Sequence, residues 1–333
     1  MRKGLICTIL CALLLAGCGE GRRRTDGKIK IGVSVYDSYD TFISELMRDF
    51  NAAVADSGDI TIEVYNASGS QQTQNKQMET MIEKGCDVIC INLVDRTSPK
   101  KIIDLAKKNN IPVIFFNREL VEEDLNQWEE LYYVGADAAE SGIMEGEVAA
   151  EALRDEAADK NGDGVIQYIV LEGEAGHQDA IVRTERSVDT LIDAGYEVDK
   201  IASAIANWNR SQAQTRMAGF IDTFGDEIEL VLGNNDDMAL GAIDAYKAAG
   251  IEREEWPVIV GIDGTTAGLQ AVVNGEMVGT VFNDQKGQAE AMAKLAAKLA
   301  RGESLEDLNI KNGRYIRLPY QKVTIDNVKN YLD

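Results

Sequence analysis

The sequence predicts an α/β protein built from two doubly wound domains, each with a parallel sheet. Short runs of β-branched residues alternate with longer amphipathic stretches, and several of the runs, such as residues 112–116 and 257–262, contain no polar side chain. Continuous apolar strands are typical of parallel sheets that helices cover on both faces. About ten such strands are many for one open sheet, so we expect two domains.

The expected strands are short runs rich in valine and isoleucine, bounded by turn residues. They cover residues 29–35, 60–65, 87–93, 112–116, 165–171, 197–204, 227–232, 257–262 and 278–282. The expected helices lie between the strands and present an apolar stripe on one face. They cover residues 41–55, 71–84, 138–153, 180–193, 211–224, 238–249 and 288–301. A strand, a helix and the next strand in this order form the unit from which parallel sheets are made.

The first 17 residues have the layout of a secretion signal. A basic start precedes an apolar run that is too short to span a bilayer. The run ends in Leu-Ala-Gly-Cys at residues 15–18, which resembles a bacterial lipobox. We therefore expect residues 1–17 to be a lipoprotein signal peptide, Cys18 to be lipidated and residues 18–27 to be a tether, with the protein extracytoplasmic and held to the membrane by its lipid alone. The alternative is an ordinary secretory signal that is cleaved at about the same place.

Composition excludes some classes of partner and site. The chain has 34 Lys and Arg against 56 Asp and Glu, a formal net charge of −22. Such a surface repels nucleic acid, so we expect no nucleic-acid partner. Beyond the leader the cysteines are Cys86 and Cys90, which on a strand would lie ~13 Å apart. That is too far for a disulfide, and two thiols alone are too few for a metal site, so we expect buried free cysteines.

Polar and aromatic residues follow the ends of the predicted strands. They are Asp40, Phe42, Asn117, His177, Asp179, Trp208, Asn235, Asp263 and Asn283. The carboxyl ends of strands in open α/β sheets are where ligands bind, so these residues predict a shared cleft. The alternative is that loops are polar in any protein.

These residues, together with several longer segments, resemble the glucose/galactose-binding family of bacterial ABC sugar transporters. The segments are Phe-Phe-Asn-Arg-Glu at 115–119, Tyr-Tyr-Val-Gly at 132–135, Glu-Ser-Gly-Ile at 140–143, Gly-Glu-Ala-Gly-His-Gln-Asp-Ala at 173–180, Asn-Asn-Asp at 234–236 and Gly-Thr-Val-Phe-Asn-Asp at 279–284. The similarity runs from about residue 29 to residue 328. It implies the type I periplasmic-binding-protein fold, in which a three-crossing hinge joins the two domains.

The resemblance places residues 28–135 plus 284–316 in an N-terminal domain and residues 136–283 plus 317–333 in a C-terminal domain. It implies that D-glucose or D-galactose is captured between them and delivered to the membrane subunits of an ABC importer. We expect a monomer that is not an enzyme. Which of the two sugars binds more tightly is left open.

The family's sugar-contacting positions keep their residue types in this chain. They fall on Asp40, Phe42, Asn117, His177, Asp179, Arg183, Trp208, Asn235, Asp263 and Asn283. A pyranose has two C–H faces and a rim of hydroxyls, which suit aromatic rings and planar polar groups respectively. Phe42 and Trp208 would cover the faces, and Arg183 would donate through two nitrogens. Departures from the family lie beside the site, at Tyr39, Thr41 and Gln178, and bear on fine specificity.

Residues 159–167 resemble the front of an EF-hand calcium loop. Oxygen-bearing side chains stand at positions 1, 3, 5 and 9, glycine at 6, and a backbone carbonyl would serve at 7. The side chains at positions 1, 3, 5 and 9 are those of Asp159, Asn161, Asp163 and Gln167, the glycine at position 6 is Gly164, and the carbonyl at position 7 belongs to Val165. Position 12 is a valine, and the resemblance supplies the missing carboxylate from Glu229. We expect structural Ca²⁺, and the alternative is an ordinary polar turn.

The same residues bear on three other functional classes. Enzyme motifs are missing: the chain has no nucleophile elbow, no glycine-rich phosphate loop and one histidine. A sugar-responsive repressor would need a helix-turn-helix where this chain has its leader, which excludes that class. A sensory protein that presents the sugar to a chemoreceptor or a sensor kinase would use the same fold and site, so this alternative stays open.

Overall fold

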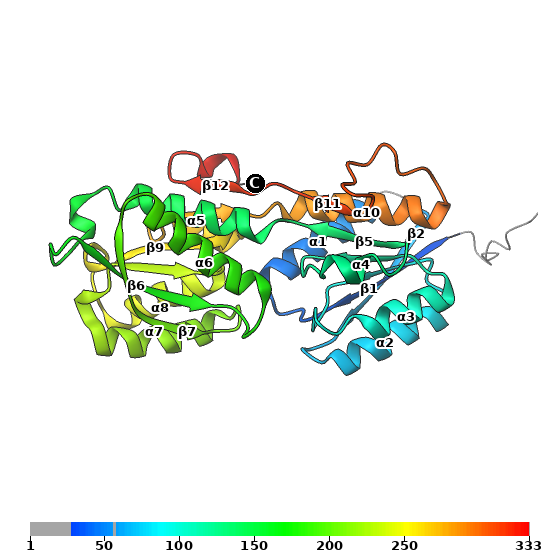
Figure 1. Ribbon diagram of the computed structural model, residues 1–333, viewed down its shortest axis with the longest axis horizontal. Helices are drawn as coiled ribbons and strands as arrows, with labels where there is room; N and C mark the ends of the chain where they lie inside the picture. The colour runs from blue at the N-terminus through cyan, green and yellow to red at the C-terminus, as the bar shows by residue number, and fades with distance from the viewer. Residues whose placement is uncertain (1–27, 56–57, 333) are drawn as a thin grey trace, which may run out of the picture.

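The computed structural model describes residues 28–55 and 58–332 and shows two lobes that lie side by side (Figure 1). The predicted signal peptide (residues 1–17), Cys18 and the predicted tether (residues 18–27) lie outside the described residues. Each lobe contains one six-stranded sheet with helices on its faces. The predicted fold class, two parallel-sheet α/β domains, is confirmed.

The first lobe contains the sheet with strand order β11-β5-β4-β3-β1-β2, in which every pairing is parallel. Its elements are β1 (Ile29–Val35), α1 (Thr41–Ala55), β2 (Ile60–Asn66), α2 (Gln71–Glu83), β3 (Val88–Ile91), α3 (Lys100–Asn109), β4 (Val113–Phe116), α4 (Glu122–Leu125), β5 (Leu131–Gly135), α10 (Gln285–Arg301) and β11 (Tyr315–Arg317). Helices α1 and α10 pack together on one face, and α2 and α3 on the other.

The second lobe contains the sheet with order β12-β10-β9-β8-β6-β7, in which β12 alone runs antiparallel to its neighbour. Its elements are α5 (Ala138–Ala152), β6 (Val165–Glu172), α6 (Gln178–Asp193), β7 (Glu197–Ile205), α7 (Arg210–Phe224), β8 (Leu230–Gly233), α8 (Asp236–Ala249), β9 (Val258–Asp263), α9 (Thr266–Val273), β10 (Gly279–Phe282) and β12 (Gln321–Thr324). Helices α5 and α6 pack side by side, as do α7 and α8.

Burial on both faces explains why central strands such as β3 and β4 are apolar at every position. In β4, Ile114 and Phe116 enter the cluster under α1 and α10, whereas Val113 and Phe115 enter the cluster under α2 and α3. Successive side chains of a strand point to opposite faces, so a strand between two helical layers has no polar side.

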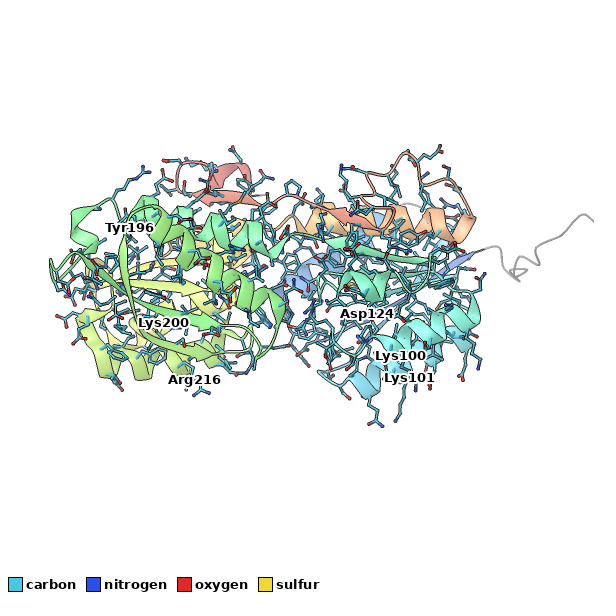
Figure 2. All side chains as sticks on the ribbon, in the orientation of Figure 1. Lys100, Lys101, Asp124, Tyr196, Lys200 and Arg216 are labelled. Carbon is cyan, nitrogen blue, oxygen red and sulfur yellow. The ribbon has the colours of Figure 1, made fainter. Side chains whose placement is uncertain are left out.

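The chain passes between the sheets three times: from β5 to α5, from β10 to α10 and from β11 to β12 (Figure 1). The loops that follow β1, β4, β6 and β9 lead toward the space between the lobes. Figure 2 shows side chains from both lobes meeting there, whereas the labelled Lys100 and Lys101 of α3 lie on the outside.

Three further observations complete the fold. Cys86 and Cys90 are both buried and unpaired, which confirms the expected free thiols. The strand predicted for 227–232 begins at Leu230, because residues Gly225–Glu227 form a 3-10 turn. Within the described part of the chain, no helix is both long and apolar enough to cross a membrane.

Candidate functional site

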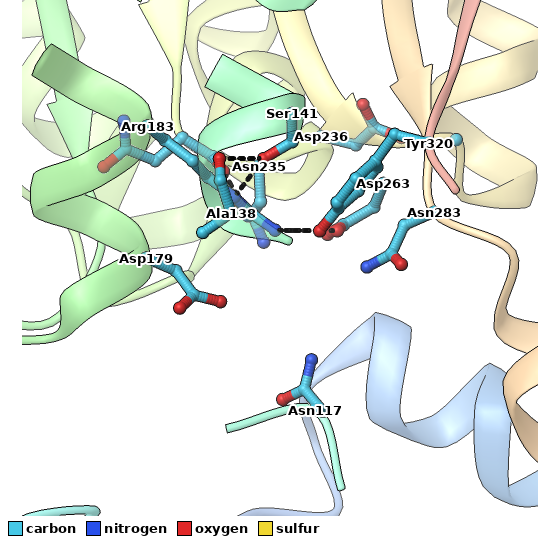
Figure 3. Close-up of polar contacts among 12 residues, drawn as sticks. Asn117, Ala138, Ser141, Asp179, Arg183, Asn235, Asp236, Asp263, Asn283 and Tyr320 are labelled. Atoms are coloured by element: carbon cyan, nitrogen blue, oxygen red, sulfur yellow. Dashed lines mark hydrogen bonds and ion pairs between the residues drawn. The ribbon is translucent and has the colours of Figure 1, made fainter. Parts of the chain in front are cut away.

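One pocket between the lobes gathers nine of the ten predicted sugar-contacting residues. Three come from the first lobe and six from the second: Asp40, Phe42 and Asn117, then His177, Asp179, Arg183, Trp208, Asn235 and Asp263. Figure 3 shows Asn117 facing Asp179, Arg183 and Asp263 across the gap. The pocket therefore depends on both lobes.

The tenth residue, Asn283, is not among the residues that line this pocket. It is buried at the second crossing of the hinge, and its Oδ1 accepts a hydrogen bond from Gln288 Nε2 at 2.6 Å. Its backbone N–H donates to the Asp263 carbonyl at 2.8 Å, and its nearby side chain opposes the rise that burial causes in the pKa of the Asp263 carboxyl. In this structure Asn283 thus supports a pocket residue.

Two lining residues were missed from the sequence, Tyr36 and Arg118. Tyr36 directly follows β1, and Arg118 lies two residues after β4. The same strand-end rule that picked out Asp40 and Asn117 applies to both, so the signal was present in the sequence.

Tyr36 and Ile43 orient the carboxylate of Asp40. The Tyr36 hydroxyl donates to Asp40 Oδ2 at 2.5 Å, and the backbone N–H of Ile43 donates to Oδ1 at 2.8 Å. Burial raises the pKa of Asp40 above its ordinary value, and these two hydrogen bonds oppose the rise. The Asp40 carboxylate is therefore a hydrogen-bond acceptor held in a fixed orientation at one end of the first-lobe wall.

Arg183 is the polar centre of the second-lobe wall (Figure 3). Its guanidinium donates to Ser141 Oγ at 3.1 Å, to the Asn234 carbonyl at 2.8 Å and to the Tyr320 hydroxyl at 3.0 Å. Asp263 Oδ1 lies 4.0 Å from Arg183 Nη2. Burial raises the pKa of Asp263 well above its ordinary value, and Arg183 opposes that rise. The fork of Arg183 is thus fixed by neutral acceptors while its charge faces the buried acid.

Phe42 and Trp208 give the pocket an aromatic surface on each lobe. Both rings line the pocket, and both also belong to the buried apolar cluster of their own lobe. The backbone of Gly173 packs directly against the Trp208 ring, because a Cβ atom on residue 173 would lie 2.1 Å from the nearest ring atom. His177 meets the same ring edge-on, with ring centroids 5.2 Å apart. Trp208 therefore has a core face and a pocket face, so replacing it would also lower stability.

Three pocket residues have positive backbone φ angles: Asn117 at 60°, Trp208 at 60° and Asp263 at 128°. Residues other than glycine rarely adopt this region, and it costs about 1–3 kcal/mol where they do. Local bonds hold two of them: Tyr133 donates to the Asn117 carbonyl at 2.8 Å, and the Asn283 N–H donates to the Asp263 carbonyl at 2.8 Å. Strain of this kind is typical of sites whose geometry is set in advance.

His177 should be neutral, with its proton on Nε2. Its Nδ1 accepts the Asp179 backbone N–H at 3.2 Å, and burial lowers its pKa to about 4, although Asp179 opposes this. We expect ¹⁵N NMR of the chain's single histidine to show an unprotonated Nδ1 that titrates near pH 4. Because the unfolded state takes up this proton first, folding stability should rise with pH between about 4 and 6.5. The urea-unfolded protein, which should titrate near 6.5, is the control. The same value in the folded protein would contradict the lowered pKa, and a protonated Nδ1 would contradict the tautomer.

The loop at residues 159–167 is held by its own side chains. Asp159 accepts the N–H groups of Gly162 and Gly164 at 2.7 and 2.9 Å, and Asp163 accepts that of Val165 at 2.8 Å. Gly162 has a φ of 71°, which the turn requires.

Glu229 reaches this loop from the start of the neighbouring β8. Its carboxylate accepts the backbone N–H of Lys160 at 2.6 Å and that of Gln167 at 3.0 Å. Asn161 donates through its side chain to Gln167 at 3.1 Å. Among the described residues, no three His, Cys, Asp or Glu side chains form a group that could hold a metal ion. The six predicted ligands nevertheless lie around one loop and are all oxygen donors, which fits Ca²⁺ in kind.

Known proteins resemble this chain over almost its whole length. Residues 31–304 match the family model of the periplasmic binding protein domain. The chain is 32% identical to the D-galactose/methyl-galactoside binding periplasmic protein MglB of Haemophilus influenzae, with 100% of each chain covered. It is 31% identical to a xylitol-binding protein of Mycolicibacterium smegmatis, over 88% of this chain and 78% of that one.

Among solved structures, the chain resembles an ABC transporter solute binding protein of Bacillus halodurans with bound myo-inositol. The TM-score is 0.78 at 30% identity, and the match covers 92% of this chain and 97% of the other. Sequence and fold agree, and the chain belongs to the periplasmic binding protein family.

Proposed function

We propose that this protein is the extracytoplasmic sugar-binding component of an ABC importer, and that its ligand is D-glucose or D-galactose. The observation that carries the proposal is the pocket between the lobes, which offers one aromatic surface from each lobe and a polar rim between them. A pyranose has the matching shape, with two apolar faces and hydroxyls at its edge. Anchoring through Cys18 would keep the protein at the membrane surface.

Names and bound ligands of similar proteins support this class of ligand. D-galactose is named for the Haemophilus influenzae relative, and myo-inositol is bound in the Bacillus halodurans structure. Both are six-membered rings rimmed with hydroxyls. Xylitol, named for another relative, is an open-chain polyol, so the family's fold alone does not decide which sugar binds.

Binding would close the lobes over the sugar. Asp40, Phe42 and Asn117 belong to one lobe and the other pocket residues to the second, so neither lobe alone can satisfy the ligand. Contacts that are complete only in the closed form shift an open–closed equilibrium toward that form. The transporter could then distinguish the loaded protein from the empty one by the arrangement of its two lobes.

A calorimetric panel tests the choice of sugar. D-glucose and D-galactose should each bind residues 19–333 with one-to-one stoichiometry, and D-ribose about 100-fold more weakly, because a smaller sugar leaves buried polar groups without partners. Xylitol and myo-inositol complete the panel. If ribose, xylitol or myo-inositol binds as tightly as the hexoses, the proposed specificity is wrong.

We also propose that the loop at residues 159–167 binds Ca²⁺ with a structural role. Asp159, Asn161, Asp163 and Gln167 would contribute side-chain oxygens, Val165 its carbonyl oxygen and Glu229 its carboxylate. The ion would tie the loop to the start of β8, because Glu229 precedes that strand and already contacts the loop. It would take no part in binding the sugar, since none of these six residues lines the sugar pocket.

A further inference from the structure

An ion pair joins the two lobes beside the sugar pocket. Arg118 lies in the first lobe after β4, and Glu174 lies in the second lobe between β6 and α6. The guanidinium donates to both carboxylate oxygens, from Nη1 at 3.0 Å and from Nη2 at 2.8 Å. The Arg118 side chain is 4% exposed and that of Glu174 is 33% exposed. Such a two-pronged, half-buried pair is stronger and less screened by salt than a surface pair.

The first lobe fixes Arg118 independently of its partner. Its guanidinium carbon lies 3.5 Å from the centroid of the Tyr36 ring, and Nη1 also donates to the Val94 carbonyl at 2.9 Å. All of these groups belong to the first lobe. The guanidinium is therefore ordered before the lobes meet, and closure needs to immobilise little more than the side chain of Glu174.

The two residues also flank sugar-binding candidates. Arg118 directly follows Asn117 in the sequence. Glu174 lies in the same loop as His177, and the backbone N–H of His177 donates to the Glu174 carbonyl at 3.0 Å. Bringing the pair together therefore brings these two walls of the pocket to their closed spacing.

A different edge of the interface has the opposite charge character. There Thr41 of the first lobe donates to Asp237 of the second at 2.7 Å, and the Thr266 N–H donates to Glu45 Oε1 at 3.2 Å. Glu45 Oε2 is buried without a hydrogen-bond partner among the described residues. Closure at this edge thus buries carboxylates that each gain a single neutral donor from across the interface.

The charges around Asp237 differ in sign pattern from those at Arg118 and Glu174. Burial raises the pKa of Asp237, the Thr41 hydroxyl and Arg210 oppose the rise, and the carboxylates of Asp40 and Glu45 add to it. Like charges approach each other here, whereas opposite charges meet at Arg118 and Glu174.

We propose that Arg118 and Glu174 form a clamp that stabilises the closed form and so sets the affinity for the sugar, without Glu174 touching the sugar. This inference rests on the proposed sugar capture. The apparent affinity of a ligand scales with the population of the form that binds it, so a contact that favours closure tightens binding. Because the clamp must break before the lobes open, it should act mainly on the dissociation rate.

The test is Glu174→Gln, which removes the charge and keeps the shape. In the full protein, the hexose that binds wild type best should bind the variant about tenfold more weakly and dissociate correspondingly faster, while the melting temperature without sugar stays the same. Glu45→Gln is the matched control: it removes one carboxylate charge from the other edge and should leave the affinity unchanged or slightly tighter.

A double-mutant cycle with Arg118→Gln separates the clamp from other effects of Glu174. In the Arg118→Gln background, Glu174→Gln should weaken binding no further, because the partner is already gone. Equal affinities of Glu174→Gln and wild type would overturn the clamp, as would an equal loss in Glu45→Gln or an undiminished effect without Arg118. Failure of wild type to bind any hexose is a different result, which overturns the proposed function itself.

Discussion

Arg183→Lys should weaken hexose binding by at least about 100-fold, which is about 2.7 kcal/mol. The guanidinium makes three hydrogen bonds from fixed directions, to Ser141, Asn234 and Tyr320, and its charge lies near buried Asp263. A lysine ammonium cannot reproduce this fork, and it is more strongly hydrated and therefore harder to bury. Loss of the fork would leave polar groups in the pocket without partners.

Calorimetry with D-galactose and D-glucose measures the effect, and circular dichroism below the melting transition checks that the variant is folded. Arg186→Lys is the matched control, because Arg186 lies one turn further along α6 and forms a surface pair with Asp189 in which both side chains are more than half exposed. It should change affinity by less than about twofold. An Arg183→Lys protein that is folded and binds as wild type does would show that the guanidinium is not part of the sugar site.

The fold could be predicted from the sequence where an element carries its own signal. The apolar runs that became β1, β4 and β6 and the amphipathic stretch of α1 were placed to within a residue or two. The short strands β11 and β12 were not predicted. Each has three or four residues and exists because it pairs with β5 or β10, so its stability comes from the sheet.

Helices α3 and α9 were also missed, for a different reason. The ten residues of α3 include four lysines, and the eight residues of α9 form one apolar block with little polar face. A short helix shows too few turns for its periodicity to stand out, and most of its stability comes from packing. The pattern of apolar residues is therefore informative for long helices and weak for short ones.

The sequence could predict which residues form the site, but it could not predict their backbone angles or their contacts with residues distant in the chain. The strand-end rule and the family resemblance gathered nine residues that the structure places in one pocket. The positive φ of Asp263 depends on surrounding contacts, and Tyr320, which bonds Arg183, lies 137 residues away in the chain. Likewise, the ion pair between Arg118 and Glu174 forms only when the two lobes meet, so no local sequence pattern predicts it.

Removal of calcium should lower the melting temperature by about 10 °C. An ion that binds only the native state and is present at about 1,000 times its dissociation constant stabilises that state by about 4 kcal/mol, and each kcal/mol shifts the melting temperature of a domain of this size by about 2–4 °C. The physical reason is the loop itself: the carboxylates of Asp163 and Glu229 both accept hydrogen bonds from Gln167, and the ion would add a direct positive charge between loop and strand that these neutral donors do not supply.

Paired melts in excess calcium and in excess chelator measure the shift, and Asp163→Ala should remove it. Asp226→Ala is the control, because Asp226 is an exposed acid close to Lys160 of the same loop but outside the predicted ligands. That variant should keep the full sensitivity to chelator, which separates a lost ligand from a lost negative charge nearby. Identical melts of wild type in calcium and in chelator, with the metal content checked by atomic absorption, would show that the loop is held by its hydrogen bonds alone.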